Sequence, residues 1–165
     1  MKNIWSLVFL ISLLSACKPS AEDAINYNDQ MISEQAKVAT VLDSLNQLIK
    51  NKDTLNITSF YNKTLEEVKK SIDSIQKTTD FNKEPDYKNQ MLKLLKTYQS
   101  LTENEYHQVI DICLISDSSL TKDTLAFLNK TLLQINDKIS VQMKEFTHFQ
   151  QDFAKKYEFS LVDSK

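Results

Sequence analysis

The sequence of 165 residues contains no glycine. A protein of this length would have roughly a dozen, because glycine makes up about 7% of an average composition. Phosphate-binding loops, dinucleotide fingerprints and tight hairpin turns need glycine for positive φ angles or for close backbone approach. None of these motifs can form here in its usual shape. Since the chain has only two prolines as well, its composition favours helix almost throughout.

Arginine is also absent, so every basic residue is a lysine. The bidentate clamps with which guanidinium groups hold phosphates and carboxylates are therefore excluded. The 20 basic residues face 22 acidic ones, which gives a net charge of −2. Because there is neither a basic excess nor a basic run, we expect no nucleic-acid partner.

Long hydrophobic runs are missing except at the N-terminus. Lys2 precedes an apolar run over residues 4–14, which is shorter than the roughly 20 residues that cross a membrane and fits the core of a signal peptide. Residues 14–17 read Leu-Ser-Ala-Cys and resemble a bacterial lipobox, in which the cysteine thiol receives a diacylglycerol. We predict a cleaved lipoprotein signal peptide over residues 1–16 and a lipidated tether over 17–20, attached through Cys17.

Acyl chains on Cys17 would hold the chain to a membrane, because each buried CH₂ contributes roughly 0.8 kcal/mol and two or more chains anchor stably. We therefore expect a lipid-anchored protein of the bacterial outer membrane. Whether it faces the cell surface or the periplasm stays open. The alternative is an ordinary signal peptide with an incidental cysteine. The other cysteine, Cys113, lies in an apolar stretch that is typical of a core residue.

The remaining chain, residues 21–165, shows apolar residues at helical spacing in four stretches. We expect helices from about residue 20 or 21 to 51, 53 or 54 to 78, 86 to 115 and 120 to 157. Ser20 followed by Asp23 resembles a capping box at the first of these. A polar joint over residues 79–85 and a serine-rich break after residue 115 separate the later helices.

Four long amphipathic stretches with short joints predict an all-α protein, an antiparallel up-down-up-down four-helix bundle. The last stretch carries a heptad-like seam that predicts one inward face. Its members are Leu125, Leu128, Leu132, Ile135, Ile139, Phe146, Phe149 and Phe153. A three-helix coiled coil with one stray helix is the main structural alternative.

Four polar residues fall in line with the apolar seams. Asn28 and Gln35 continue a heptad of the first helix, Glu105 follows Leu101 by four residues, and Gln142 takes a seam position in the last helix. A buried polar side chain lowers stability unless it is satisfied, and such residues often fix register and partner choice. The alternative is a polar pocket that binds a small molecule or a metal. We expect Glu105 and Gln142 to lie at similar heights in the bundle.

No catalytic or metal-binding constellation stands out. Glu145 and His148 form the Glu-x-x-His pattern of di-metal bundles, but Phe146 and Phe149 hold the inward positions, so we expect both to face solvent. We therefore predict no metal, no cofactor and no enzymatic activity, with an accessory or hydrolase role as a further alternative.

Several short motifs also resemble a known family. They are Tyr-Asn-Asp at residues 27–29, Thr-Asp-Phe at 79–81, Glu-Tyr at 105–106 and Gln-Asp-Phe-Ala-Lys-Lys-Tyr at 151–157. In this order and spacing the chain resembles a family of small helical surface lipoproteins of spirochaetes and Bacteroidota. One departure is Glu-Pro-Asp at residues 84–86, where the family has a Gly-Asp turn. The resemblance implies a helical fold, a surface role and no catalytic residues.

These observations predict a lipid-anchored, extracytoplasmic helical bundle without catalytic activity. Such a protein would serve as an interaction or structural module at the bacterial envelope surface. Its partners would be the membrane, through the N-terminal lipid, and a protein that the sequence does not name.

Overall fold

The computed structural model describes residues 19–161, and these residues are all-helical. No strand forms among them; one isolated bridge joins Phe81 and Glu84. The all-α prediction is confirmed. The predicted signal peptide, Cys17 and residues 162–165 lie outside the described residues. The elements in chain order are α1 (Ala21–Lys50), α2 (Ile57–Lys77), α3 (Asp86–Leu101), a π-helical turn (Thr102–Tyr106), α4 (His107–Cys113), a 3₁₀ turn (Asp117–Ser119) and α5 (Lys122–Lys156).

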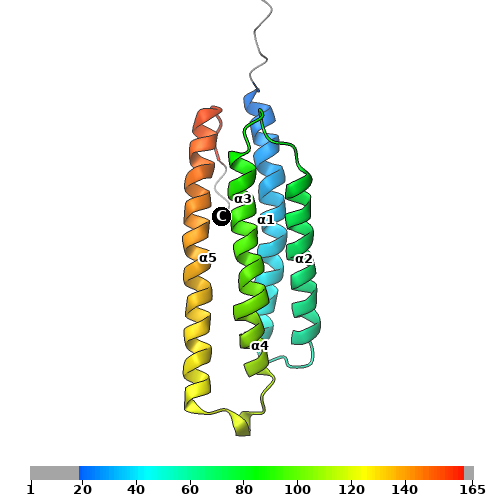
Figure 1. Cartoon of the computed structure of the whole chain (residues 1–165), viewed down its shortest axis with the longest axis vertical. Helices are drawn as coiled ribbons and strands as arrows, with labels where there is room; N and C mark the ends of the chain where they lie inside the picture. Colours follow the sequence, from blue (N-terminus) through cyan, green and yellow to red (C-terminus); the bar gives the residue numbers. More distant parts are fainter. Residues whose placement is uncertain (1–18, 162–165) are drawn as a thin grey trace, which may run out of the picture.

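The helices lie side by side along one long axis (Figure 1). The π-helical turn continues α3 directly into α4, so residues 86–113 form a single rod. The α1–α2 turn and the α4–α5 joint lie at one end, called the distal end here. The N-terminus of α1 and the C-terminus of α5 lie at the other, the tether end.

Local hydrogen bonds explain where the two longest helices begin. The Asp23 N–H donates to Ser20 Oγ at 3.1 Å, and the Ser20 N–H donates to Asp23 Oδ2 at 2.9 Å. This is the capping box expected from the sequence, and the bonds from Ser20 lower the pKa of Asp23. Thr121 caps α5 in the same way, accepting from the Thr124 N–H at 3.1 Å. The second helix begins at Ile57, later than predicted, because residues 53–56 form a turn.

The most deeply buried side chains come mainly from the first three rods. They include Met31, Val38, Leu45, Ile57, Val68, Ile75, Met91, Leu95, Leu101 and Val109. Helix α5 adds Ile135, Phe146 and Phe153, while its remaining seam residues are half-buried or exposed. Leu125, which was predicted to face inward, is 44% exposed. The predicted seam therefore holds along the tether half of α5 and weakens toward its distal start.

The π-helical turn shifts the buried face of the third rod by one residue. An α-helix continuing from Leu101 would bring Glu105 inward, as the sequence spacing predicts. The wider turn instead buries Thr102 and Tyr106 and leaves Glu105 at the edge, with its side chain 15% exposed. The Thr102 hydroxyl donates to the Tyr98 carbonyl at 2.7 Å. Such bonds compete with the regular helical pattern.

Because the chain has no glycine, other residues take the left-handed backbone positions. Lys52, Asn82, Lys83 and Glu158 have φ between 52° and 62°. Glu158 follows α5, where the Phe159 N–H donates to the Ala154 carbonyl at 3.0 Å and the Glu158 N–H to the Lys155 carbonyl at 3.4 Å. This is a Schellman ending, which usually has glycine at the left-handed residue. A Cβ there costs about 1–2 kcal/mol.

We predict that Glu158→Gly stabilises the protein by about 1 kcal/mol, since relief at the left-handed residue exceeds the added entropy of the unfolded chain. Urea unfolding followed by circular dichroism at 222 nm measures the change. Glu158→Ala is the matched control, because it removes the same charge and keeps the Cβ. Equal stability of the two variants would show that the backbone conformation is not the cause.

Candidate functional site

Aromatic side chains from α1, the α2–α3 joint, α3 and α5 meet at the tether end. The ring centroid of Phe81, in the α2–α3 joint, lies 5.1 Å from that of Tyr27 on α1 and 5.0 Å from that of Tyr157 at the end of α5. Phe153 lies 4.4 Å from Tyr87. Such tilted and edge-to-face pairs add about 0.5–1.5 kcal/mol each beyond burial. This aromatic cluster therefore joins the tether ends of α1, α3 and α5.

The cluster surrounds a buried amide. Asn28 is 6% exposed, and its Oδ1 accepts from the Tyr87 hydroxyl at 2.6 Å and from the Gln150 amide at 2.8 Å. Its Nδ2 donates to Asp29 Oδ1 at 3.0 Å. Burial raises the pKa of Tyr87, so its hydroxyl stays protonated and remains a donor. Asn28 thus connects α1, α3 and α5 through satisfied hydrogen bonds.

A further amide–tyrosine pair follows between α1 and the third rod. The Tyr106 hydroxyl donates to Asn46 Oδ1 at 3.0 Å. The paired positions advance together along the two rods. Because each buried tyrosine hydroxyl needs a partner, these pairs fix the register of α1 against α3 and α4.

The side-chain amide of Gln35 donates its hydrogen bond to a weak acceptor. Its Nε2 donates to the sulfur of Met143 on α5 at 3.8 Å, and a thioether accepts hydrogen bonds only weakly. Gln35 is half-buried and lines a groove between α1 and α5. Among the predicted polar residues, Asn28 and Gln35 therefore border the same space, together with Gln150.

Glu105 and Gln142 lie apart from that space. Glu105 Oε1 pairs with Lys138 on α5, while its Oε2 is buried without a hydrogen-bond partner. The half-buried Gln142 donates instead to Glu145 Oε2 on its own helix at 3.1 Å. The four predicted polar residues therefore do not form one layer. Tyr87, Tyr106 and Gln150 were missed as polar partners, although tyrosine hydroxyls within an apolar stripe were a signal.

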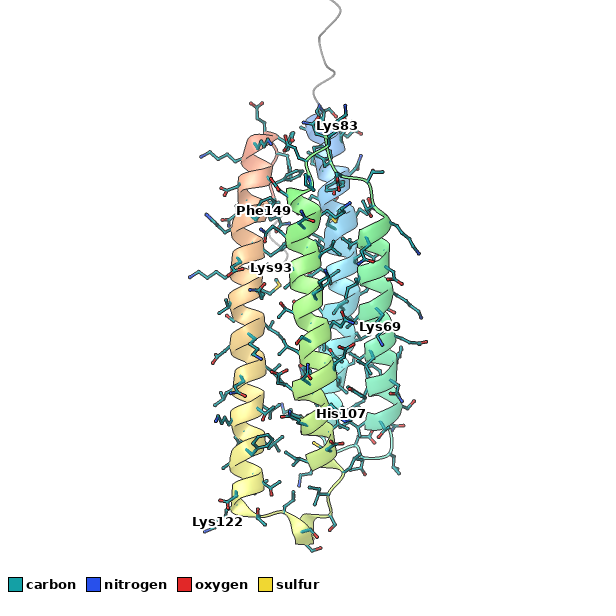
Figure 2. All side chains as sticks on the ribbon, in the orientation of Figure 1. Lys69, Lys83, Lys93, His107, Lys122 and Phe149 are labelled. Atoms are coloured by element: carbon teal, nitrogen blue, oxygen red, sulfur yellow. The ribbon has the colours of Figure 1, made fainter. Side chains whose placement is uncertain are left out.

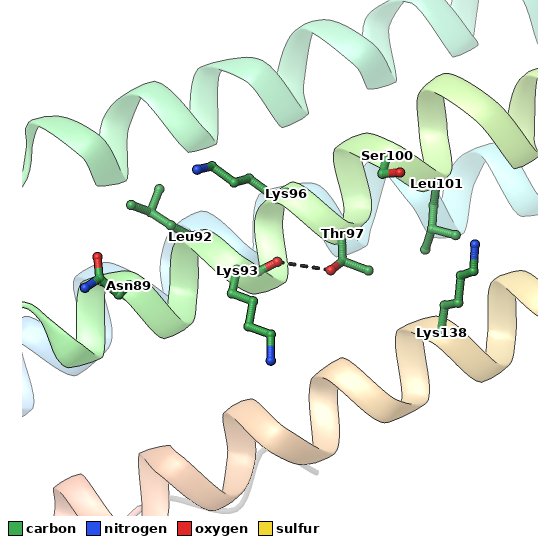
Figure 3. A pocket seen from close by; sticks show the side chains of 8 residues that line it. All are labelled: Asn89, Leu92, Lys93, Lys96, Thr97, Ser100, Leu101 and Lys138. Atoms are coloured by element: carbon green, nitrogen blue, oxygen red, sulfur yellow. Dashed lines mark hydrogen bonds between the residues drawn. The ribbon is translucent and has the colours of Figure 1, made fainter.

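A second groove on the outer face of α3 gathers lysines. It has a volume of about 530 Å³ and is bordered by Lys93 and Lys96 of α3 and Lys138 of α5 (Figure 3). Lys93 pairs with Glu145 and Lys138 with Glu105, so two of the three charges are already balanced. This groove has little remaining attraction for an anion.

The distal end carries exposed apolar side chains. Leu55 in the α1–α2 turn is 91% exposed, and Leu114, Ile115, Leu125 and Phe127 are between 39% and 48% exposed. All five lie in or next to the two connections at that end (Figure 1). We call them the distal apolar residues. Concentrated apolar exposure of this kind is typical of protein interaction sites.

The histidines and Cys113 lie outside these features. His107 stacks on Tyr61 at 5.8 Å, and His148 is an exposed residue 3.8 Å from Asp152. Burial raises the pKa of the half-buried Cys113 thiol, which lowers its reactivity. Within residues 19–161, no three acidic, histidine or cysteine side chains gather as a metal site. Nor is any helix there sufficiently long and apolar to cross a membrane.

Comparison with known proteins found no matching family model, no matching curated protein and no matching solved structure. The short motifs at residues 27–29, 79–81 and 151–157 meet in space. Tyr27, Phe81, Phe153 and Tyr157, which belong to those motifs, all lie in the aromatic cluster.

We predict that Tyr87→Phe destabilises the protein by about 1 kcal/mol, because it removes one hydrogen bond and leaves Asn28 bonded to Gln150. Asn28→Ala should cost about 2–3 kcal/mol, since it leaves the buried Tyr87 hydroxyl and the half-buried Gln150 amide without their acceptor. Urea unfolding measures both. The double variant should lose less stability than the sum of the losses in the two single variants. A loss equal to that sum would contradict the hydrogen bond between Tyr87 and Asn28.

Proposed function

We propose that this chain is a lipid-anchored, extracytoplasmic four-helix bundle of the bacterial envelope, which acts without catalysis as an interaction or structural module. In this proposal residues 1–16 are removed, Cys17 carries the lipid, and the outer membrane holds the tether end. We also propose kinship with the small helical surface lipoproteins of spirochaetes and Bacteroidota, which the shared motifs of the aromatic cluster support.

The observation that carries the docking part of this proposal is the position of the distal apolar residues. They lie at the end opposite the N-terminus of α1. Helix α1 has 30 residues, and at 1.5 Å per residue it separates the two ends by about 45 Å. A chain anchored at Cys17 would thus present these apolar side chains away from its own membrane.

The occupant that fits this end is a partner protein. Exposed leucine, isoleucine and phenylalanine side chains gain by burial at roughly 25 cal/mol per Å² of apolar surface. Aromatic residues such as Phe127 are enriched in the buried cores of protein interfaces. At the tether end, by contrast, the large aromatic side chains of the described chain are packed into the aromatic cluster, with Phe81 and Phe149 partly exposed.

The anchor is tested by metabolic labelling. We predict that bacteria expressing the full chain incorporate labelled palmitate into it, and that Cys17→Ser abolishes the label and releases the protein from membranes. Cys113→Ser is the matched control, because the chain has only two cysteines, and it should keep the label. Label that survives Cys17→Ser would refute the lipid anchor.

Docking is tested by site-specific photo-crosslinking in cells of the source organism. We predict that benzoylphenylalanine in place of Phe127 or Leu55 gives one discrete adduct, identified by mass spectrometry as a second protein. Val141 is the matched control, since it is 57% exposed midway along α5, and replacement there should give no adduct.

An adduct only between copies of this chain, an equal yield at Val141, or no adduct at either distal position would contradict a protein partner at the distal end. Phe127→Ser should also reduce the adduct formed from position 55. Because both residues are exposed, these replacements leave the core intact.

A further inference from the structure

A groove of about 600 Å³ runs between α1 and α5 on the tether half of the molecule. This volume lies within the range of small-molecule sites. Its apolar walls come from Ile25 and Ile32 on α1 and from Met143 and Phe146 on α5. The groove exists because α1 packs mainly against α2 and α5 mainly against α3, so that α1 and α5 touch each other little.

The chain after α5 supplies the outer wall of this groove. Glu158, in the left-handed conformation, reverses the backbone. Residues 159–161, called the tail here, therefore return beside α5 (Figure 1). Phe159 then packs on Phe153, with ring centroids 6.0 Å apart. Phe159 and Leu161 both line the groove. A ligand there would lie between two helices and a short extended segment.

The groove offers a defined polar contact at its floor. Asn28 Oδ1 accepts from the Tyr87 hydroxyl and from the Gln150 amide, so the Asn28 side chain is fixed. The hydrogen bond that the structure gives Gln35 runs from its Nε2 to the Met143 sulfur at 3.8 Å. A carbonyl or hydroxyl oxygen is a much stronger acceptor than a thioether. A ligand bearing one would improve the hydrogen bonding of Gln35.

The charge of the lining selects among ligands. No lysine or histidine lines this groove, and its single charged group is Asp29. An anion would therefore be repelled and would find no cation. The polar lining otherwise consists of amides and hydroxyls, which bind uncharged groups.

We propose that the groove between α1 and α5 binds a small uncharged amphipathic molecule. Its carbonyl or hydroxyl oxygen accepts from Gln35 Nε2, and its apolar body lies between Ile32, Met143 and Phe146 under the tail. This activity goes beyond the proposed docking at the distal end and does not depend on it, since the two places lie at opposite ends of the rod.

The test uses residues 19–165, which contain every described helix, labelled with methyl-¹³C methionine. Met31 and Met91 are fully buried, whereas Met143 lines the groove, so one methyl signal reports on the groove and two serve as internal controls. Met143→Leu assigns the reporter signal. The probes are octanamide, octanoate and octylammonium, which share a chain length and differ in charge.

We expect octanamide to shift the Met143 signal saturably and to leave Met31 and Met91 in place. Octanoate should bind at least about tenfold more weakly. Gln35→Leu should weaken octanamide binding about fivefold, as expected for one lost hydrogen bond. Gln134→Leu, the same substitution at an exposed position of α5, should leave binding unchanged.

A second variant covers the case in which Gln35→Leu disturbs the fold. Leu161→Ser alters only the outer wall, after the last helix, and should also weaken octanamide binding. The proposal is overturned if Met143 shows no saturable shift, if octanoate binds as well as octanamide, or if Gln134→Leu has the effect of Gln35→Leu. It is also overturned if Leu161→Ser leaves binding unchanged.

Discussion

The structure depends on the burial of the apolar stripes of α1, α2 and the α3–α4 rod against one another. Most fully buried side chains belong to these three rods, while α5 is joined to them chiefly through aromatic contacts in its tether half. Phe149, labelled in Figure 2, reaches from α5 to within 5.8 Å of Tyr87 on α3. Toward the distal end α5 loses this packing, and Leu125 and Phe127 are exposed there. The firm packing of α5 at the tether end and the exposure of Leu125 and Phe127 therefore have one origin, the unequal attachment of α5.

The amide–tyrosine pairs give this apolar core its register. An apolar stripe by itself allows one helix to slide past another. In any other register, however, the Tyr87 hydroxyl would lose Asn28 and the Tyr106 hydroxyl would lose Asn46. Buried hydroxyl groups without hydrogen-bond partners lower stability. The same pairs shape the groove. Asn28 is hydrogen-bonded on both its oxygen and its nitrogen at the floor of the groove, whereas Gln35 donates only to a thioether. Gln35 therefore remains able to bind a ligand oxygen.

The lack of glycine has consequences well beyond the excluded motifs. Left-handed positions that usually have glycine, after α1, after α5 and in the α2–α3 joint, are taken here by lysine, glutamate and asparagine, which lowers stability at each of them. At Glu158 that turn sends Phe159 and Leu161 back along the molecule. The absence of glycine thus affects the candidate ligand groove, because the residues that follow the left-handed Glu158 form one of its walls.

The sequence by itself determined the helical class, the approximate limits of the helices, the Ser20 cap and the inward position of Asn28, since these depend on spacing and on contacts a few residues apart. Tertiary structure decided the rest. The π-helical turn moved Glu105 to the edge, where it pairs with Lys138, and Tyr106 into the core. Tyr87, 59 positions from Asn28, became its partner only once α1 and α3 had packed. Periodicity shows that a helix has an apolar face, whereas the choice of neighbour, the depth of packing and the groove that remains depend on how all the faces fit together in space.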